Sequence, residues 1–295
     1  MKQEARAPSE KRGGGQNTFS YYPGCALKSS AREYDISARL CCESLGIELR
    51  ELADWTCCGA SSAHATSDVL AVALPGKDLH AASEAGYPLV TACAMCFSRL
   101  KIAAHETADM ATRTLAGDVS GNIVPVMHLL EVIDSRLASL VPNKGLAGLK
   151  VACFYGCLLV RPKAVAIDDA ENPQVMDRLM RTIGAEPMPW AFKTECCGAG
   201  LPLARPDIVR RLSHRILLSA AAVGADCVAV ACPECHANLD MHQAGMGGKH
   251  GGEVRVPVVY FTQLLGLSLG FSPYELHLDR HMVDPLPALS SKGLA

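Results

Sequence analysis

The sequence has little net charge and no long apolar run, and both absences argue against particular classes of protein. Lysine and arginine total 28 against 30 acidic residues, for a net charge of -2. A nucleic-acid partner is therefore disfavoured, because such partners select a basic surface. The longest apolar stretches, 216–223 and 256–269, are short or interrupted by polar residues. We expect no membrane span.

Familiar cofactor motifs are also missing. No Gly-x-Gly-x-x-Gly stretch and no phosphate loop with Lys-Ser or Lys-Thr occurs, so a nucleotide or flavin is not expected on this chain. No ferredoxin-type Cys-x-x-Cys-x-x-Cys run is present. Residues 1–16 lack the apolar segment of a secretion signal, so we expect a disordered N-terminal tail and a cytoplasmic protein.

Cysteine, in contrast, is abundant: the chain has 14. In a reducing compartment, closely spaced cysteines bind metal or carry out redox chemistry more often than they form disulfides. Four cysteines recur after a constant interval, since 139 residues separate the members of each pair: Cys57 and Cys196, Cys58 and Cys197, Cys93 and Cys232, Cys96 and Cys235. A constant interval indicates that one half of the chain is a copy of the other.

Predicted strands and helices alternate in both halves, which is typical of an α/β fold. Strands are predicted at 18–22, 47–52, 88–91, 122–126, 150–155, 186–188, 227–230 and 256–258. Helices are predicted at 31–45, 68–82 with an interruption at Pro75-Gly76, 97–105, 127–140, 173–183, 207–223 and from Phe261. We expect two tandem duplicated domains related by a pseudo-two-fold axis. Each would be a small, mostly parallel sheet with flanking helices and with cysteines at the carboxyl ends of its strands.

The best linker is the turn-forming stretch 142–145, Pro-Asn-Lys-Gly. We therefore predict a first domain over 17–144 and a second over 145–271. Residues 272–295 contain three prolines and no clear periodicity, which predicts an extended C-terminal tail.

Each half offers a fifth cysteine at a strand-to-helix turn. Cys25 follows Pro-Gly, and Cys157 follows Tyr-Gly; Cys153 competes with Cys157 but falls inside the predicted strand. Five thiols are one more than a tetrahedral zinc or an ordinary cubane needs, and adjacent cysteines chelate a single ion only with strain. A cluster of several irons removes that difficulty. Zinc in one or both sites, or a set of buried thiols, remains an alternative.

These motifs resemble those of the CCG-domain proteins and, among them, the subunit-B family of heterodisulfide reductase. The matching residues run from Tyr21–Cys25 through 57–64 to Cys232–His236. The resemblance implies two noncubane [4Fe-4S] clusters, each held by five cysteines. The first set would be Cys25, Cys57, Cys58, Cys93 and Cys96, and the second Cys157, Cys196, Cys197, Cys232 and Cys235.

The resemblance also implies an activity, an oxidoreductase acting on sulfur groups, with a disulfide cleaved or formed between the clusters. Its substrate would be the heterodisulfide of coenzymes M and B, or another thiol or protein-bound sulfur, as in bacterial sulfur-oxidation complexes. A subunit-C-like iron-sulfur protein and a subunit-A-like flavoprotein would be the partners. The alternative is a non-catalytic electron-transfer or anchoring subunit, because CCG domains also occur in glycolate, lactate and succinate oxidoreductases.

Other polar residues near the motifs have two interpretations each. His64 and His236 are candidate catalytic proton donors to a leaving thiolate, or they pack on the site. Lys28, Arg32 and Lys193 would attract an anionic thiol, or they are solvated. The remaining cysteines, Cys41, Cys42 and Cys227, lie in apolar patterns and are expected in the core.

Overall fold

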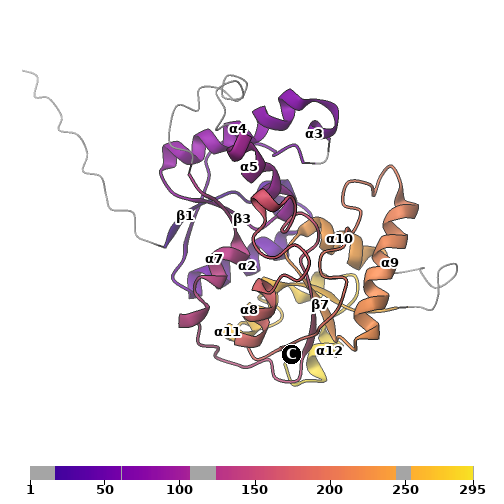
Figure 1. The fold of residues 1–295 in the computed structure, drawn as a ribbon. Helices are drawn as coiled ribbons and strands as arrows, with labels where there is room; N and C mark the ends of the chain where they lie inside the picture. Colours follow the sequence, from indigo (N-terminus) through magenta and orange to yellow (C-terminus); the bar gives the residue numbers. More distant parts are fainter. Residues whose placement is uncertain (1–16, 61, 107–123, 244–253, 295) are drawn as a thin grey trace, which may run out of the picture.

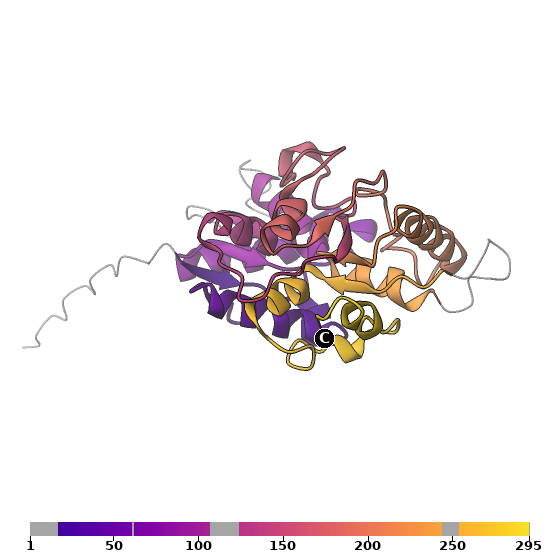
Figure 2. The same cartoon turned by 90° about the horizontal axis from the view of Figure 1, so that it is seen from below.

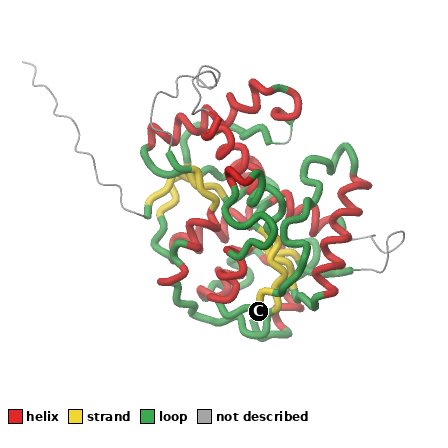
Figure 3. Tube along the Cα trace, viewed as in Figure 1, coloured by secondary structure: helices red, strands yellow, loops and turns green. Residues whose placement is uncertain are grey.

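The computed structural model describes residues 17–60, 62–106, 124–243 and 254–294. Within these ranges the chain forms two four-stranded sheets, with strand orders β2-β1-β3-β4 and β6-β5-β7-β8 (Figure 1). Neighbouring strands in both sheets run parallel. Figure 3 shows the two sheets as separate groups of yellow strands among red helices. The predicted tandem α/β architecture is confirmed.

The first half contains four strands and the helices that follow them. In chain order these are β1 (Thr18–Tyr21), α1 (Gly24–Lys28), α2 (Arg32–Ser44), β2 (Glu48–Glu51), α3 (Ala63–Thr66), α4 (Asp68–Ala85), β3 (Leu89–Thr91), α5 (Ala94–Glu106), β4 (Val126–His128), α7 (Leu129–Asp134) and η1 (Leu137–Ser139).

The second half repeats this order. Its elements are β5 (Lys150–Phe154), η2 (Lys163–Val165), α8 (Val175–Thr182), β6 (Glu186–Pro187), α9 (Pro206–Ala222), β7 (Cys227–Val230), α10 (Pro233–Met241), β8 (Val258–Tyr260), α11 (Phe261–Leu269), η4 (Leu278–Arg280) and α12 (Leu286–Ser290). Every residue of β3, β7 and β8 is buried, as in parallel sheets that helices cover on both faces.

The two halves pack through a reciprocal exchange of helices. The helix that ends the first sheet, α7, packs on α8 of the second half, and α11, which ends the second sheet, packs on α2 of the first. On one side Tyr34 stacks on Tyr260 with ring centroids 4.0 Å apart. On the other, Arg178 Nη2 donates to Asp134 Oδ2 at 2.8 Å. Figure 2 shows the yellow C-terminal segment lying against the indigo elements of the first half.

Several predicted boundaries were wrong, and proline accounts for three of them. Helix α4 runs unbroken through Pro75, which is buried, and the helix as a whole packs against α5. Strands β4 and β8 begin after Pro125 and Pro257, because proline has no N–H to donate to the sheet. The carbonyls of these prolines still accept from Leu89 N and Val228 N at 2.8 Å.

The C-terminal segment was predicted to be extended, but it contains η4 and α12. Four leucines from it are buried in the core: Leu276, Leu278, Leu289 and Leu294. Burial of their side chains compensates for the ordering of a segment that has no helical periodicity. The predicted N-terminal tail, 1–16, lies outside the described residues, and the exact domain boundaries remain predictions.

Candidate cysteine-rich site

The repeated cysteines stand where strands end and the chain turns. Cys25 lies in α1 after β1, Cys57 and Cys58 follow β2, and Cys93 and Cys96 follow β3. The second half places Cys157, Cys196, Cys197, Cys232 and Cys235 at the corresponding points. Because carboxyl ends of parallel strands meet at one edge of a sheet, each fold gathers its five thiols there.

All fourteen cysteines lie within the described ranges, and each is a free thiol. Two contacts repeat between the halves: Sγ of Cys58 lies 3.4 Å from Sγ of Cys96, and Sγ of Cys197 lies 3.4 Å from Sγ of Cys235. In four further pairs one thiol lies close enough to shift the pKa of the other: Cys25 and Cys57, Cys93 and Cys96, Cys157 and Cys196, and Cys232 and Cys235.

The two groups of thiols lie side by side across the boundary between the halves. Helix α1, which holds Cys25, packs on α10, which holds Cys235. Cys93 and Cys232, both buried, lie close enough for each thiol to shift the pKa of the other. The structure therefore brings the ten predicted residues into two neighbouring five-thiol groups. Cys41, Cys42, Cys153 and Cys227 are buried as well, and Cys153 lies within β5.

Glycine is needed at the turns beside these thiols. Gly24 and Gly156 have φ values of +73° and +66°. A Cβ on Gly24 would lie 2.9 Å from Sγ of Cys96, and one on Gly156 would lie 3.2 Å from Sγ of Cys235. Only glycine allows the backbone to approach a thiol this closely in a left-handed conformation. Gly59 and Gly198, with φ values of +71° and +84°, turn the two Cys-Cys-Gly loops in the same way.

The close packing of the thiols changes their acidity. Hydrogen bonds from Cys235 and Cys93 hold the pKa of Cys232 well below its usual range. The hydrogen bond from Cys157 lowers the pKa of Cys196 to about 6. The partner thiols Cys93, Cys157 and Cys235 have raised pKa values, so each contact favours one thiolate beside one thiol. Holding all of these groups as thiolates requires a metal centre to compensate their charge.

The first group of thiols also lines a cavity of about 510 Å³, which all five of them border. Its opposite wall comes from the second half, from the loop 199–203 and from Glu234. The donor set is purely sulfur, and the space exceeds what a single ion requires. The residues present therefore fit a group of several metal atoms.

Comparison with known proteins identifies the family. A profile of the cysteine-rich domain, CCG, matches residues 19–101 and 151–240, which include all ten of these cysteines. This chain belongs to the CCG family.

Two relatives from the CCG family align over nearly the whole chain. The 8-methylmenaquinol:fumarate reductase membrane anchor subunit of Wolinella succinogenes is 32% identical, over 91% of this chain and 98% of that protein. The subunit-B protein of the ferredoxin/F(420)H(2)-dependent CoB-CoM heterodisulfide reductase of Methanosarcina acetivorans is 27% identical, over 92% and 96%. No helix in the described ranges is both long and apolar enough to cross a bilayer.

The crystal structure of a hypothetical protein from Helicobacter pylori has a similar fold, with a TM-score of 0.74 and 13% sequence identity. The similarity covers 92% of this chain and 53% of that protein, so this chain spans about half its length. At this identity the similarity concerns the fold alone.

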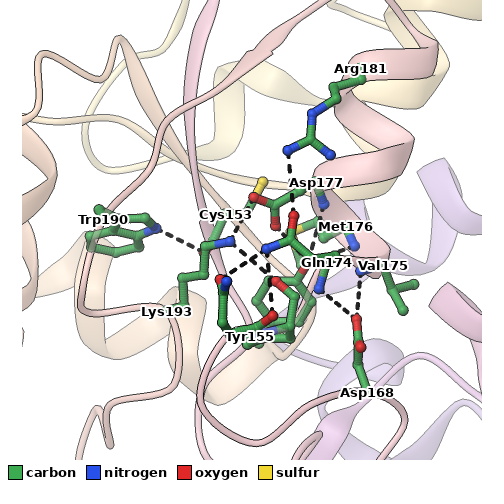
Figure 4. A network of polar contacts seen from close by, with 12 residues as sticks. Cys153, Tyr155, Asp168, Gln174, Val175, Met176, Asp177, Arg181, Trp190 and Lys193 are labelled. Atoms are coloured by element: carbon green, nitrogen blue, oxygen red, sulfur yellow. Dashed lines mark hydrogen bonds and ion pairs between the residues drawn. The ribbon is translucent and has the colours of Figure 1, made fainter.

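Lys193 belongs to a buried network that supports the second site of this CCG protein (Figure 4). Its Nζ donates to Asp177 Oδ1 at 2.7 Å, and Asp177 Oδ2 accepts from the Tyr155 hydroxyl at 2.7 Å. The Lys193 carbonyl accepts from the backbone N–H groups of Tyr155 and Gly156. The network thus ties the turn before Cys157 to the loop before Cys196. Both interpretations of Lys193, as a solvated residue and as one that attracts an anionic thiol, were wrong, because the side chain is buried and paired with Asp177.

The two candidate histidines occupy different environments. His64 is exposed on α3. His236 is buried, with Nε2 2.7 Å from Nδ1 of His281 and 3.0 Å from the carbonyl oxygen of Val258. Burial, and after it His281, holds the pKa of His236 well below its usual range, so this ring is neutral near pH 7. A role as proton donor remains a prediction for both residues.

Two acidic residues near the thiols were not predicted from the sequence. Glu234 borders the 510 Å³ cavity, and its position inside the second Cys-x-x-Cys was a signal that could have found it. Asp78 is fully buried in α4, where Oδ1 accepts from the backbone N–H of Thr56 at 2.8 Å, just before Cys57. Nothing in its local pattern marks Asp78, because its contact with Thr56 depends on the tertiary fold.

Proposed function

We propose that this chain is the catalytic iron-sulfur subunit of a multisubunit oxidoreductase, and that two noncubane [4Fe-4S] clusters in it reduce or form a disulfide. The observation that supports the proposal is the gathering of five thiols at the edge of each sheet, with α1 of the first half packed on α10 of the second. The heterodisulfide reductase relatives support an iron-sulfur redox role.

The chain's own residues would hold the clusters in a defined way. Cys25, Cys57, Cys58, Cys93 and Cys96 would bind one, and Cys157, Cys196, Cys197, Cys232 and Cys235 the other. When bound, each cluster would supply one-electron redox chemistry and an iron able to accept sulfur. Gly24 and Gly156 let the chain close on the thiols, and the apolar wall over the first group limits access of water.

The reaction needs partners to balance. Breaking an S–S bond consumes two electrons and two protons and releases two thiols; forming one reverses this. The electrons would come from a subunit-C-like iron-sulfur protein and a subunit-A-like flavoprotein, and the protons from solvent. His64, exposed on the first half, remains the histidine placed to exchange protons with water. A cytoplasmic location of the complex is part of this proposal.

Metal analysis tests the proposal directly. Anaerobically purified chain should contain about eight irons, since each proposed cluster has four. Cys96→Ser and Cys235→Ser should each lower this to about half, because each removes a buried ligand from one group only. Cys41→Ser, a matched change at a buried thiol that donates to the carbonyl of Thr262, should keep the full iron content. About four irons with one zinc would contradict the two-cluster site.

A second candidate function is electron transfer in a quinol-linked fumarate reductase complex, without disulfide chemistry. The 32% identity to the Wolinella succinogenes subunit over nearly its full length favours it. Adding small disulfides to the reduced protein separates the two candidates. A new paramagnetic signal from a cluster-bound thiolate supports the catalytic role. Its absence with every disulfide, together with oxidation of a menaquinol analogue by the assembled complex, supports the second candidate.

A further inference from the structure

The cavity over the first thiol group has an uneven lining. Apart from the five cysteines, most of its residues are apolar: Pro23, Ala26, Ala60, Met95, Ala199, Gly200, Pro202 and Leu203. Leu203 is 99% exposed at the rim, so the apolar surface extends outward from the cavity. Ser62 adds a hydroxyl, and Glu234 adds a carboxyl group. Apart from the cysteines, Glu234 is the only described lining residue with a charged side chain.

Basic side chains near this cavity are paired elsewhere. Lys28 donates to Glu51 at 2.7 Å, and Lys193 is buried against Asp177. Arg205, two residues beyond Leu203, pairs with Asp207 at 2.8 Å. A substrate that approaches a cluster held by the five thiols passes the rest of this lining. It meets apolar groups and one carboxyl, with no described cation among the lining residues to receive a carboxylate, sulfonate or phosphate.

A second cavity shows that the chain does not avoid cations in general. It has a volume of about 560 Å³ between α2, α10 and the C-terminal segment, and its lining includes Arg32 and Arg280 together with the carboxyl groups of Glu33 and Asp240. None of the ten thiols borders it. Basic side chains thus line a cavity other than the one that the first thiol group borders. Arg32, which the sequence suggested as a contact for an anionic thiol, lies there.

We propose that the redox site selects an uncharged or amine-bearing disulfide or thiol with an apolar body, and that Glu234 discriminates against anionic substrates. This inference rests on the proposed disulfide chemistry. An anionic group entering the cavity would lose hydration without gaining a partner, and it would lie near the carboxylate of Glu234. A neutral chain loses little hydration, and an ammonium group gains the carboxylate as its partner.

Three disulfides of similar size provide the test: bis(2-hydroxyethyl) disulfide is neutral, cystamine is cationic and 3,3′-dithiodipropionate is anionic. The full-length protein with its clusters is supplied with reduced methyl viologen, two molecules of which provide the two electrons. Two protons come from solvent, the S–S bond breaks, and two thiols are released. At low ionic strength we expect kcat/KM for the anionic disulfide to be at least about tenfold below that for the neutral one, since one nearby like charge can have this effect.

Variants assign the selectivity to Glu234. Glu234→Gln should raise kcat/KM for the anionic disulfide by about three- to tenfold and lower that for cystamine, which shifts the ratio of the two. Glu33→Gln, a matched change at a carboxyl group that lines the other cavity, should leave that ratio unchanged. Added salt should raise kcat/KM for the anionic disulfide on the unmodified protein, because it screens the repulsion.

The possible failures are distinguishable. Turnover of the anionic disulfide as fast as the neutral one, or a ratio that Glu234→Gln does not move, would overturn the charge selection and leave the disulfide chemistry standing. No turnover of any of the three would overturn the proposed function and this inference with it. Titration calorimetry of the oxidised protein with each disulfide gives a readout independent of turnover, and it should follow the same order of affinity.

Discussion

The two thiol groups have the same internal pattern but different neighbours. At the residue before the last cysteine of each half, the first has Met95 and the second has Glu234. One residue after that cysteine stand Phe97 and His236, and at the end of the last strand stand His128 and Tyr260. In each half a histidine ring contacts an aromatic ring at these two positions. The histidine is at the end of the strand in the first half and after the cysteine in the second. The cysteines thus define what the halves have in common, and the residues around them define how the halves differ.

The supports behind the two sites differ as well. In the first half, the Tyr21 hydroxyl donates to Asp35, which pairs with Arg39 four residues along the same helix. The Arg39 side chain is 34% exposed. In the second half, Tyr155 donates to Asp177, and the cation is Lys193 from the loop before Cys196, with both charged side chains at most 5% exposed. The first half thus has a partly exposed ion pair beside its strand β1, and the second half has a buried one beside β5.

Breaking these two ion pairs should have very different consequences. Lys193→Met leaves Asp177 buried without its cation, so we expect a loss of about 3–5 kcal/mol in the free energy of unfolding. Arg39→Met removes two partly exposed pairs, with Asp35 and Glu51, for which a loss of about 1 kcal/mol is expected. Anaerobic urea denaturation followed by circular dichroism measures both.

Iron content adds a second readout to this comparison. Lys193→Met should reduce iron at the second site, because Lys193 links the Cys157 turn to the Cys196 loop. Equal losses of stability in Lys193→Met and Arg39→Met would show that burial does not make one ion pair more important than the other.

The glycine turns offer a smaller contrast between the halves. Gly24→Ala forces a left-handed alanine and places its Cβ 2.9 Å from Sγ of Cys96 and 3.3 Å from the Tyr22 ring. Gly156→Ala meets Sγ of Cys235 at 3.2 Å. We expect a loss of about 2 kcal/mol for Gly24→Ala and about 1 kcal/mol for Gly156→Ala, from backbone strain and contact together.

The same denaturation assay compares the two glycine variants, and iron content should fall further in Gly24→Ala. Gly46→Ala, at a positive φ with open space around the Cβ, separates backbone strain from contact with the thiol. If Gly46→Ala lowered the free energy of unfolding as much as Gly24→Ala, contact with the thiol would not explain the effect.

The smallest expected effect is a pH dependence of stability that arises from Asp78. The counterpart of Asp78 in the second half, 139 residues later, is Leu217, which does not titrate. Burial raises the pKa of Asp78 to about 6, above its usual value. The folded chain therefore holds a proton that the unfolded chain has released, and stability falls as pH rises through this window up to about 6. Between pH 5 and 7 this group should cost about 1 kcal/mol.

Asp78→Asn removes the titrating group and keeps an oxygen to accept from Thr56 N. The difference in unfolding free energy between this variant and the unmodified chain should move in the variant's favour from about pH 5 to 7. A difference that stays constant over this range would assign the pH dependence to other groups.

Much of the scaffold could be predicted because its signals are local. The strand 227–230 was predicted with the bounds that the structure gives, and Cys157 at a turn with Cys153 inside a strand follows from neighbouring residues. The constant interval of 139 residues located eight of the ten thiols. What failed depended on distant packing: α4 continues through Pro75 and packs against α5, and the C-terminal leucines order their segment by burial in the core.

The candidate site was predicted as two separate thiol sets, and no local pattern indicated that they lie side by side. The proximity of Cys93 to Cys232 and the presence of Glu234 in a cavity with Cys25 depend on how the halves meet. The enclosure of Lys193 depends on the packing of Asp177 within the second half. Residue type alone also misled for Lys193, because an unpaired lysine and one paired with a buried aspartate look alike in a sequence.

The reciprocal packing of α7 on α8 and of α11 on α2 has the form of an isologous interface, in which each copy gives its partner the contact it receives. If two separate copies of one domain paired in this way, every substitution beside one thiol group would also occur beside the other. Fusion into one chain removes that symmetry constraint, and Met95 and Glu234 have diverged. An unsymmetrical substrate would then meet a different surface at each of its two ends, so the orientation in which it binds becomes something the protein can select.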